Sequence, residues 1–555
     1  MSSRLLIFGI DGATWDLVEA WVEEGKLPNL ARFIKQGSSM TLRSTIPASS
    51  PPAWTSIITG KNPGKHGIFD FIRREPSSYN LQSMRADFTS YRSIFDLLSE
   101  QGLRVASVNV PLTYPPRPVN GFMVAGLGAP KLGNFTYPAD LKQELDQYAY
   151  ELDVGASYAE VGDEQFVLDM KRVMNSQVRF AVDKLRAEAW DLFMIVLRGT
   201  DEAQGYLWHH LDPTHPWHDP ELAKQYGDSI LDIYQESDRL LGEMAEAAGE
   251  DATILILSDH GGGPLHKEVY LNNWLREEGY LKLKTAEAKS SPLTSFLRRT
   301  GLTRDRLSSL FDGPFWRRIR ERVPLAWQHA LIPSHVPTLA ESVDWSKSKA
   351  YSFGYIGQIY INLKGREPEG IVLPEEYDAL ISEMRLKLKA MTNPEDGQPV
   401  VDHVYSADEL YEGPYRAEAP DLNLIMRNMS YIAHPRRELA YDQVFGPVTT
   451  SESGTHRVDG LAILAGQAIQ SGLLTEAHHL LDVAPTVLYC LGVPVPTYMD
   501  GSVMVDVIEP DYLADHPVTE QVVDAVNQPI ASETIWSTAE EEEVEERLRA
   551  LGYLE

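Results

Sequence analysis

Short runs of consecutive apolar residues recur along the chain, each bounded by polar residues or turn formers. A strand buried on both faces of a parallel sheet is apolar throughout, so such runs predict strands of this kind. The runs cover residues 4–10, 104–110, 191–197, 252–258 and 460–466. Helical patterns lie between most of them, for example at 27–37 and 91–102. Strands that alternate with helices predict an α/β fold, with a mostly parallel central sheet flanked by helices on both faces.

Two segments depart from this alternation. Residues 351–365 have the pattern of extra strands near an edge or a flap. Residues 281–340 are rich in Ser, Pro, Trp and basic residues, and from Lys282 to Arg322 there are 11 Lys or Arg against 4 Asp or Glu. We expect this segment to be an inserted, basic, mostly helical cap. A charged run of this kind is either a solvated helical face or a surface for an anionic substrate or a partner.

The cap divides a predicted core that consists of residues 1–280 and 341–510. Residues 511–555 form a tail that ends in TAEEEEVEERLRALGYLE, with glutamates first and arginines later. Negative charge is favoured at the start of a helix and positive charge toward its end, so this order predicts an acidic helix. We expect the helix to pack on the core or on a partner.

Charge and cysteine content narrow the class of protein. The 555 residues include 50 Lys or Arg and 80 Asp or Glu, a formal net charge of −30, which argues against binding to nucleic acid or an anionic membrane. Cys490 is the only cysteine, so no internal disulfide is expected, as in a reducing compartment. The first apolar run is too short for a signal peptide, and no run approaches the ~20 residues of a membrane span. We therefore expect a cytoplasmic protein without a transmembrane segment.

Acidic residues and histidines stand next to several predicted strands. Asp11 follows the first strand, Asp201 the third, and Asp259 with His260 the fourth, whereas His456 comes just before the fifth. One aspartate after a strand can simply cap the next helix, but ligands in open α/β sheets bind beyond the carboxyl ends of the strands. Carboxylates and neutral imidazoles together bind Zn²⁺, Mn²⁺ or a similar ion. Because they come from four places in the sequence, they predict a binuclear metal site.

Ser50 is the candidate nucleophile. It precedes Pro51, and residues 51–60 have a helical pattern with proline well placed in the first turn. Ser50 could serve only as the cap of this helix. The same position would also let the helix N-terminus stabilise a phosphate and let a metal-bound serine oxygen attack phosphorus.

Four of the 15 histidines gather in one segment, at His209, His210, His215 and His218. We interpret them as loop residues that face the mouth of the active site. A metal cluster formed by these four histidines is an alternative, although their spacing is not that of a helical or zinc-finger site.

Together these motifs resemble the alkaline phosphatase superfamily, in its type I phosphodiesterase / nucleotide pyrophosphatase branch. The resemblance is carried, in the family's order, by FGIDG, SSPPAWTSIITGKNPGKHGIFDF, VNVPLTYPPRPVNG, TDEAQ, LSDHGGG, SGTHR and DVAPTVLYCLGVPVPTYMDG. It covers most of the chain, and the cap least. It implies an alkaline-phosphatase-like sheet with an inserted cap. It also implies two divalent metal ions, Zn²⁺ in the first place and Mn²⁺ or Mg²⁺ as alternatives.

The resemblance further implies which residues bind the two ions. Asp11, Asp259, His260 and the oxygen of Ser50 would bind one ion. Asp201 and His456 would bind the other, together with a third ligand that family members place four residues after the aspartate.

Two positions depart from the family's pattern. Gly205 stands where the third ligand, a histidine, is expected, so the second site is expected to be weakly occupied. The substitutes that we consider are Glu202, Gln204, His209 and His210. Nucleotide pyrophosphatases also place an Asn three residues after the nucleophile, where it helps hold the phosphoryl oxygens, and here Ala53 stands at that position.

The function implied by the resemblance is hydrolysis of phosphodiester or pyrophosphate bonds in anionic, nucleotide-type small molecules, through a phosphoserine on Ser50. A phosphomonoesterase, or a phosphotransferase such as a mutase, is an alternative of the same fold, because substrate choice depends on the cap and the loops. A weakly catalytic or non-catalytic metal-binding protein is a third alternative, which Gly205 and Ala53 favour.

Overall fold

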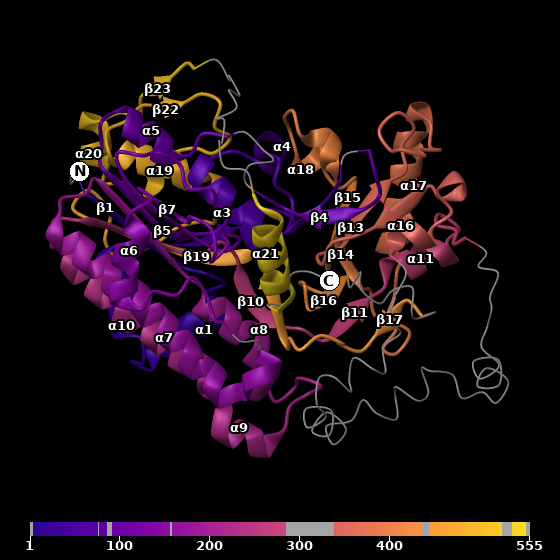
Figure 1. Cartoon of the computed structure of the whole chain (residues 1–555), viewed down its shortest axis with the longest axis horizontal. Helices are drawn as coiled ribbons and strands as arrows, with labels where there is room; N and C mark the ends of the chain where they lie inside the picture. Colours follow the sequence, from indigo (N-terminus) through magenta and orange to yellow (C-terminus); the bar gives the residue numbers. More distant parts are fainter. Residues whose placement is uncertain are drawn as a thin grey trace.

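A mixed sheet of ten strands forms the centre of the molecule (Figure 1). The structure is a computed structural model, and it describes residues 4–75, 77–85, 91–155, 158–284, 338–433, 443–523 and 536–550. Across the sheet the strand order is β20 (Leu473–Leu474), β2 (Ser38–Arg43), β19 (Asp459–Ala465), β9 (Thr253–Leu257), β1 (Leu5–Ile10), β8 (Leu192–Leu197), β5 (Val105–Val110), β6 (Gly121–Ala125) and β7 (Thr136–Tyr137). The tenth strand, β21 (His478–His479), pairs with β2. All five apolar runs of the sequence are strands of this sheet.

Five neighbouring strands, from β9 through β1, β8 and β5 to β6, run parallel, which confirms a mostly parallel sheet. Strand β19 instead runs antiparallel to both of its neighbours, β9 and β2. The prediction that its apolar run belongs to the parallel set was therefore wrong. Hydrophobicity reports that a strand is buried on both faces, and it carries no information about strand direction.

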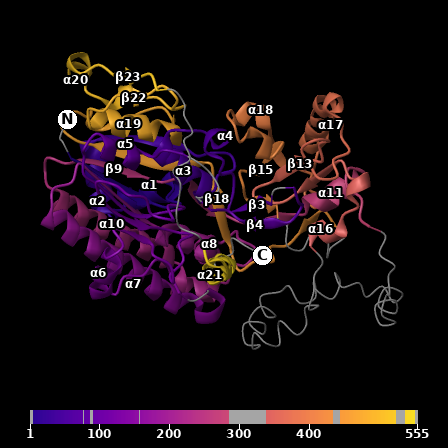
Figure 2. The same cartoon turned by 45° about the horizontal axis from the view of Figure 1, so that its top comes forward.

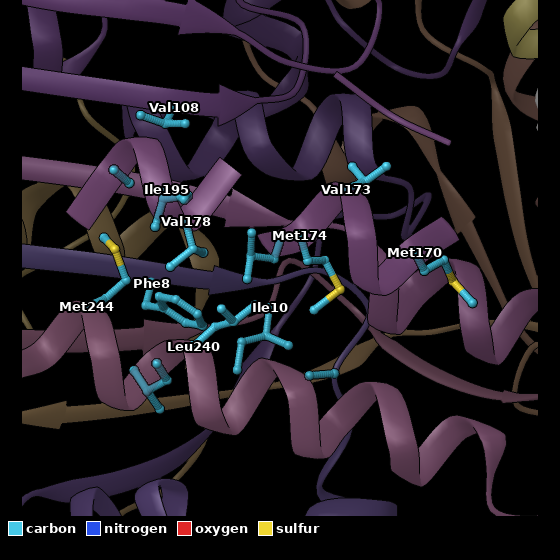
Figure 3. Close-up of a cluster of buried hydrophobic side chains, with 14 of the residues drawn as sticks. Phe8, Ile10, Val108, Met170, Val173, Met174, Val178, Ile195, Leu240 and Met244 are labelled. Carbon is cyan, nitrogen blue, oxygen red and sulfur yellow. The ribbon is translucent and has the colours of Figure 1, made fainter. Parts of the chain in front are cut away.

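Helices cover both faces of the sheet, as predicted. The first face is covered by α1 (Trp15–Glu23), α2 (Pro28–Gln36), α7 (Tyr158–Ala187), α8 (Gly199–Leu211) and α10 (Ser229–Ala248), and the second by α3 (Ser50–Thr59), α5 (Ile94–Glu100) and α19 (Val483–Cys490). Figure 3 shows Phe8 and Ile10 of β1 on the first face, among Met174 of α7 and Leu240 of α10. The intervening residue Ile7 packs in the cluster of the second face. Successive strand residues point to opposite faces, so a strand that is apolar at every position needs cover on both.

A small antiparallel sheet lies beside the main one and has its own core (Figures 1 and 2). Its strand order is β12 (Ala350–Ser352), β13 (Gln358–Ile361), β15 (Leu422–Met426) and β14 (Val401–Ser406), and α11 (Leu271–Glu277) and α17 (Tyr377–Lys389) pack on it. We call these elements the small-sheet unit. Strands β12 and β13 arise from the segment 351–365, and they belong to this unit rather than to an edge of the main sheet.

The predicted cap lies almost entirely in residues 285–337, which are outside the described residues. On either side of that segment, Leu283 and Val343 form an antiparallel bridge, and the Lys284 N–H donates to Ser342 O over 2.9 Å. The chain thus returns to the point at which it left, as expected of an insertion. The boundaries of the core at 1–280 and 341–510 stay a prediction.

The acidic C-terminal helix is present as α21 (Thr538–Ala550). It packs on the body of the chain, because Trp536, Val544 and Leu548 join the core of the first face and Arg547 pairs with Asp153 over 2.8 Å. The division of residues 511–555 from the core stays a prediction. Among the described helices, none is both long enough and apolar enough to span a bilayer.

Candidate metal centre

The predicted site residues converge at one edge of the main sheet. Asp11 follows β1, Asp201 lies in the first turn of α8 directly after β8, and Asp259 with His260 follows β9. Strands β8, β1 and β9 are adjacent and parallel, so their carboxyl ends bring these side chains together.

His456 reaches the same edge because β19 is antiparallel. The N-terminal end of an antiparallel strand lies beside the carboxyl ends of its parallel neighbours, so a residue just ahead of β19 arrives at the site. His456 stands on β18 (Gly454–Arg457), which pairs with β10 (Gly261–Pro264) so that His456 is opposite Gly262. A Cβ atom on Gly454 of β18 would lie 2.1 Å from the backbone oxygen of Gln204 of α8. This glycine therefore allows α8 to approach the hairpin closely.

Ser50 lies against the first group of predicted ligands. Its Oγ is 3.5 Å from Asp11 Oδ1 and 3.3 Å from His260 Nε2. The same His260 nitrogen is 3.6 Å from Asp11 Oδ1 and 3.4 Å from Asp259 Oδ2. Asp11, Asp259 and His260 offer ligand atoms that all lie within 4.8 Å of one another, which is close enough to surround one ion.

Asp201 and His456 form a second group beside the first. His456 Nε2 is 3.6 Å from Asp201 Oδ1, and the rings of His456 and His260 stack with centroids 3.8 Å apart. Asp201, His260 and His456 also offer ligand atoms within 4.8 Å of one another. His260 thus lies between the two groups. All six predicted residues are brought together.

The tautomers of the two histidines suit metal binding. His260 Nδ1 donates to Gly261 O over 3.0 Å, and His456 Nδ1 donates to Ala48 O over 2.8 Å. A carbonyl oxygen can only accept, so the proton of each neutral ring is on Nδ1. Each Nε2 then presents a lone pair to the carboxylates, in the arrangement found for metal-bound histidines.

The electrostatics of the site also favour the binding of cations. Asp11, Asp259 and His260 are 0% exposed. Burial, and then the charges of Asp259 and Asp201, hold the pKa of Asp11 well above its usual range. Burial, and then Asp201, raise the pKa of Asp259 to about 7, and its Oδ2 has no hydrogen-bond partner among the described residues. Burial, and then His260, lower the pKa of His456 to about 4, so this ring is neutral. Buried carboxylates without compensating charge are costly, and divalent ions would supply that charge.

Helix α3 begins at Ser50, and its N-cap is Ser49, whose side chain makes no capping hydrogen bond. The interpretation of Ser50 as the cap was therefore wrong. Pro51 and Pro52 lack N–H groups and the Ala53 N–H donates to Ser49 O, so the first turn offers a ligand only the N–H of Ser50. Ala53 is itself completely buried.

Trp54 is a site residue that sequence reasoning missed. Its Nε1–H donates to Asp11 Oδ2 over 3.0 Å, and the side chain is 0% exposed. It therefore orients the carboxylate that faces Ser50. Tryptophan one turn after the nucleophile is also what a packed helix would have, so no local signal marked this role.

Gly205 leaves open space in the second group. It lies one turn after Asp201 on α8, and a Cβ atom built on it meets nothing within 4 Å. Two proposed substitutes are engaged elsewhere: Glu202 pairs with Arg198 over 3.2 Å, and Gln204 Nε2 donates to Gly12 O over 2.8 Å.

His209 and His210 were predicted to lie in a loop, and this was wrong, because both are buried in the last turn of α8. Neither joins the group around Asp201. The helix continues through LWHHL because its apolar side chains pack on the core of the first face.

A cavity of about 70 Å³ opens in front of the second group. It is lined by Asp201, Gly205 and His456 on one side, and by Tyr355 and Ile356 near the small-sheet unit on the other. Asp70 also lines it, and burial raises the pKa of this carboxyl to about 6. The side chains from residues 355–356 gave no signal in the sequence, because their position depends on how the two sheets lie together.

The chain is similar to known proteins over the whole site. A family model for type I phosphodiesterase / nucleotide pyrophosphatase matches residues 5–459, which include all six predicted site residues. Ectonucleotide pyrophosphatase/phosphodiesterase family member 1 of Mus musculus is 23% identical over 290 residues, which are 51% of this chain and only 27% of the mouse protein.

Two solved structures align with most of the chain. Phosphonoacetate hydrolase from Sinorhizobium meliloti 1021, in complex with phosphonoacetate, has a TM-score of 0.50 at 17% identity and covers 83% of this chain and 90% of that chain. Human ectonucleotide pyrophosphatase / phosphodiesterase 5 has a TM-score of 0.49 at 12% identity and covers 91% of this chain and 99% of that chain.

The raised pKa of Asp259 generates a prediction for the chelated protein. Its carboxyl has a value of 3.8 when unperturbed and about 7 in the fold, so ionisation destabilises the fold progressively as the pH rises through this window, and no penalty remains below it. We expect Asp259→Asn to increase the free energy of unfolding in chelator near pH 8 by on the order of 1–4 kcal/mol. The Tm of the variant should therefore be higher than that of the wild type. Near pH 4 the two proteins should melt at about the same temperature.

Differential scanning calorimetry in chelator at both pH values measures this difference. The exposed Asp251→Asn is the matched control, and it should leave the Tm unchanged at either pH. A wild type more stable than Asp259→Asn near pH 8 in chelator would contradict the prediction.

Proposed function

Because the chain belongs to the type I phosphodiesterase / nucleotide pyrophosphatase family, it is a phosphoric ester hydrolase, and we propose that it cleaves phosphodiester or pyrophosphate bonds of nucleotide-type small molecules through a phosphoserine on Ser50. The observation that carries the proposal is the buried Ser50 hydroxyl, 3.5 Å from Asp11 Oδ1 and 3.3 Å from His260 Nε2 at the start of α3. A nucleophile at a helix start, among metal-ligating side chains, is suited to phosphoryl transfer.

Two divalent ions are part of the proposal. Asp11, Asp259, His260 and the Ser50 oxygen would bind the first, and Asp201 and His456 the second. The mixture of carboxylates and imidazoles suits Zn²⁺ first, with Mn²⁺ or Mg²⁺ as alternatives. When bound, such ions favour the ionised serine and neutralise charge on the phosphoryl oxygens. The single cysteine, Cys490, is free and buried, and for this reason we keep a cytoplasmic setting as part of the proposal.

The residues of the chain would organise the attack in three ways. The Trp54 Nε1–H orients Asp11, whose Oδ1 lies 3.5 Å from the Ser50 hydroxyl. The dipole of α3 favours negative charge on the serine oxygen and on the phosphoryl group beside it. The Ser50 N–H is available to a phosphoryl oxygen, although Pro51 and Pro52 reduce the donors to this one. The phosphoserine forms as the P–O bond to the leaving group breaks, and water hydrolyses it in a second step.

The leaving group would occupy the cavity beside the second ligand group. The walls contributed by Tyr355 and Ile356 give an aromatic and an apolar surface next to Asp201 and His456. Such a surface suits the base or ribose of a nucleotide better than bare inorganic phosphate.

A substrate panel tests the proposed reaction. We expect hydrolysis of bis-p-nitrophenyl phosphate and of nucleotide sugars to exceed that of p-nitrophenyl phosphate, with Zn²⁺, Mn²⁺ or Mg²⁺ added separately. A preference for the monoester would contradict the diesterase proposal and favour the phosphomonoesterase or transferase alternative. No turnover with any ion would leave the non-catalytic alternative.

Removal of the nucleophile is a second prediction. Ser50→Ala should lower kcat by at least about 10³-fold, because no other hydroxyl replaces the attacking oxygen. Ser502→Ala is the control, since this serine is exposed and does not line the cavity, and it should keep kcat within about threefold. Trapping of ³²P on the wild type but not on Ser50→Ala would identify the phosphoserine. Unchanged turnover in Ser50→Ala would remove Ser50 from this role.

Restoration of the missing ligand is a third prediction. Gly205→His should increase the affinity for the second ion by about 10-fold or more, because a histidine one turn after Asp201 projects into open space. Gly205→Ala is the control, as it adds the first side-chain atom without a ligand. Metal content after dialysis against a series of buffered Zn²⁺ concentrations measures the change. Equal and tight occupancy of two ions in all three proteins would show that the wild type lacks nothing at this position.

A further inference from the structure

A separate group of metal-ligating side chains lies at the other end of α8. Asp163, His209 and His210 offer ligand atoms that all lie within 4.8 Å of one another. The two histidines are in the last turn of α8, eight and nine residues after Asp201. At 1.5 Å per residue they are about 12 Å or more along the helix from the catalytic group. This group is therefore distinct from the proposed catalytic centre.

One tautomer of His209 suits metal binding. Ser453 Oγ lies 2.9 Å from His209 Nδ1 and 2.9 Å from Tyr206 O. When Ser453 donates to Tyr206 O, it accepts from His209 Nδ1, and the lone pair of the neutral ring is then on Nε2.

Asp163 and His210 are already in contact. His210 Nε2 is 3.0 Å from Asp163 Oδ1, and the Tyr158 hydroxyl donates to the same carboxylate oxygen over 2.5 Å. Outer hydrogen bonds of this kind orient the carboxylate ligands of metal sites. The side chain of His210 is 1% exposed and that of Asp163 is 20% exposed, so the group is buried but open on one side.

The other two histidines of the segment have different roles. His215 donates from Nε2 to Leu265 O over 2.8 Å, and its Nδ1 accepts from the Trp217 N–H over 3.1 Å. His218 Nδ1 donates to His209 O over 2.9 Å. They hold the backbone that follows α8 and do not belong to the ligand group.

We propose that Asp163, His209 and His210 bind one Zn²⁺ or a similar borderline ion, with water from the open side as a fourth ligand. One carboxylate and two imidazoles are a zinc donor set. The C-terminal end of α8 adds the negative end of the helix dipole, which favours a cation. Binding through His210 Nε2 would require the imidazole proton on Nδ1, which has no hydrogen-bond partner in the described part of the chain, so the ion would also have to offset the cost of that buried N–H.

The ion would tie together three segments that otherwise meet through hydrogen bonds. Asp163 belongs to α7, the histidines to α8, and Ser453 to the loop that leads into β18 and His456. The Ser453 N–H also donates to Gly205 O over 2.7 Å. The site would thus be structural, and it would stabilise the loop on which His456 depends.

Metal content in a protein with a disabled catalytic centre tests the proposal independently of the proposed function. The full chain with Asp201→Asn and Asp259→Asn is stripped with chelator, dialysed against buffered Zn²⁺ and analysed by mass spectrometry of the metal. We expect about one Zn²⁺ per chain, and loss of nearly all of it when His210→Gln is added. No retained Zn²⁺, or equal Zn²⁺ with and without His210→Gln, would overturn the proposal.

Two further variants guard against misfolding and against a loosely bound ion. Asp163→Asn keeps the size of the side chain and removes its charge, so we expect affinity for Zn²⁺ to fall by about 10-fold or more with an unchanged far-UV spectrum in chelator. His218→Gln, in the same segment, should keep the Zn²⁺. An equal loss in His218→Gln would mean that the histidine-rich segment as a whole attracts the ion. Unchanged affinity in Asp163→Asn would decide against the site even if His210→Gln did not fold.

Discussion

Three carboxylates at the ends of three adjacent parallel strands, all withdrawn from water, are the constraint on which the rest of this structure depends. Asp11, Asp201 and Asp259 repel one another, and burial raises the energy of each charge further. The surrounding contacts compensate only in part: a tryptophan N–H, a few backbone N–H groups and two neutral imidazoles. Bound cations would supply the missing positive charge at neutral pH, and the Nε2 atoms of the two imidazoles face the carboxylates that would bind them. The burial that destabilises the three charged carboxylates is thus also what favours the binding of cations between them.

Helix α8 is the second element that organises the molecule. Its first turn carries Asp201, its middle leaves open space at Gly205, and its last turn carries His209 and His210. The hairpin β10–β18 packs along it closely enough that a Cβ atom at Gly454 would lie 2.1 Å from the backbone oxygen of Gln204. Through Ser453, the same helix contacts the loop that precedes His456. Backbone contacts thus join α8 to the segment that carries His456.

The resemblance recognised in the sequence accounts for the family. It also predicted six site residues, and the structure brings all six together. The residues near Ser50 that depart from the family's pattern can also be interpreted in the structure. Ala53 is buried within α3 and does not face the cavity, and the two prolines after Ser50 leave one N–H where several were expected. Under the proposed function, cations would therefore hold the phosphoryl oxygens more than backbone or amide donors would. The histidine-rich segment, in contrast, was misjudged, because a helix with polar residues in its last turn was taken for a loop.

The sequence by itself determined the buried strands, the helices between them and the acidic residues that end the strands, because burial and helix or strand period are local properties that the order of residues records. Tertiary structure decided what depends on direction and on partners distant in the chain. An apolar run does not encode strand direction, yet the antiparallel course of β19 is what brings His456 to the site. The small-sheet unit gives walls to the cavity, and Asp163 meets His210 across 47 positions of sequence. Such contacts arise only when separate elements pack, since no local pattern specifies which of them will be neighbours.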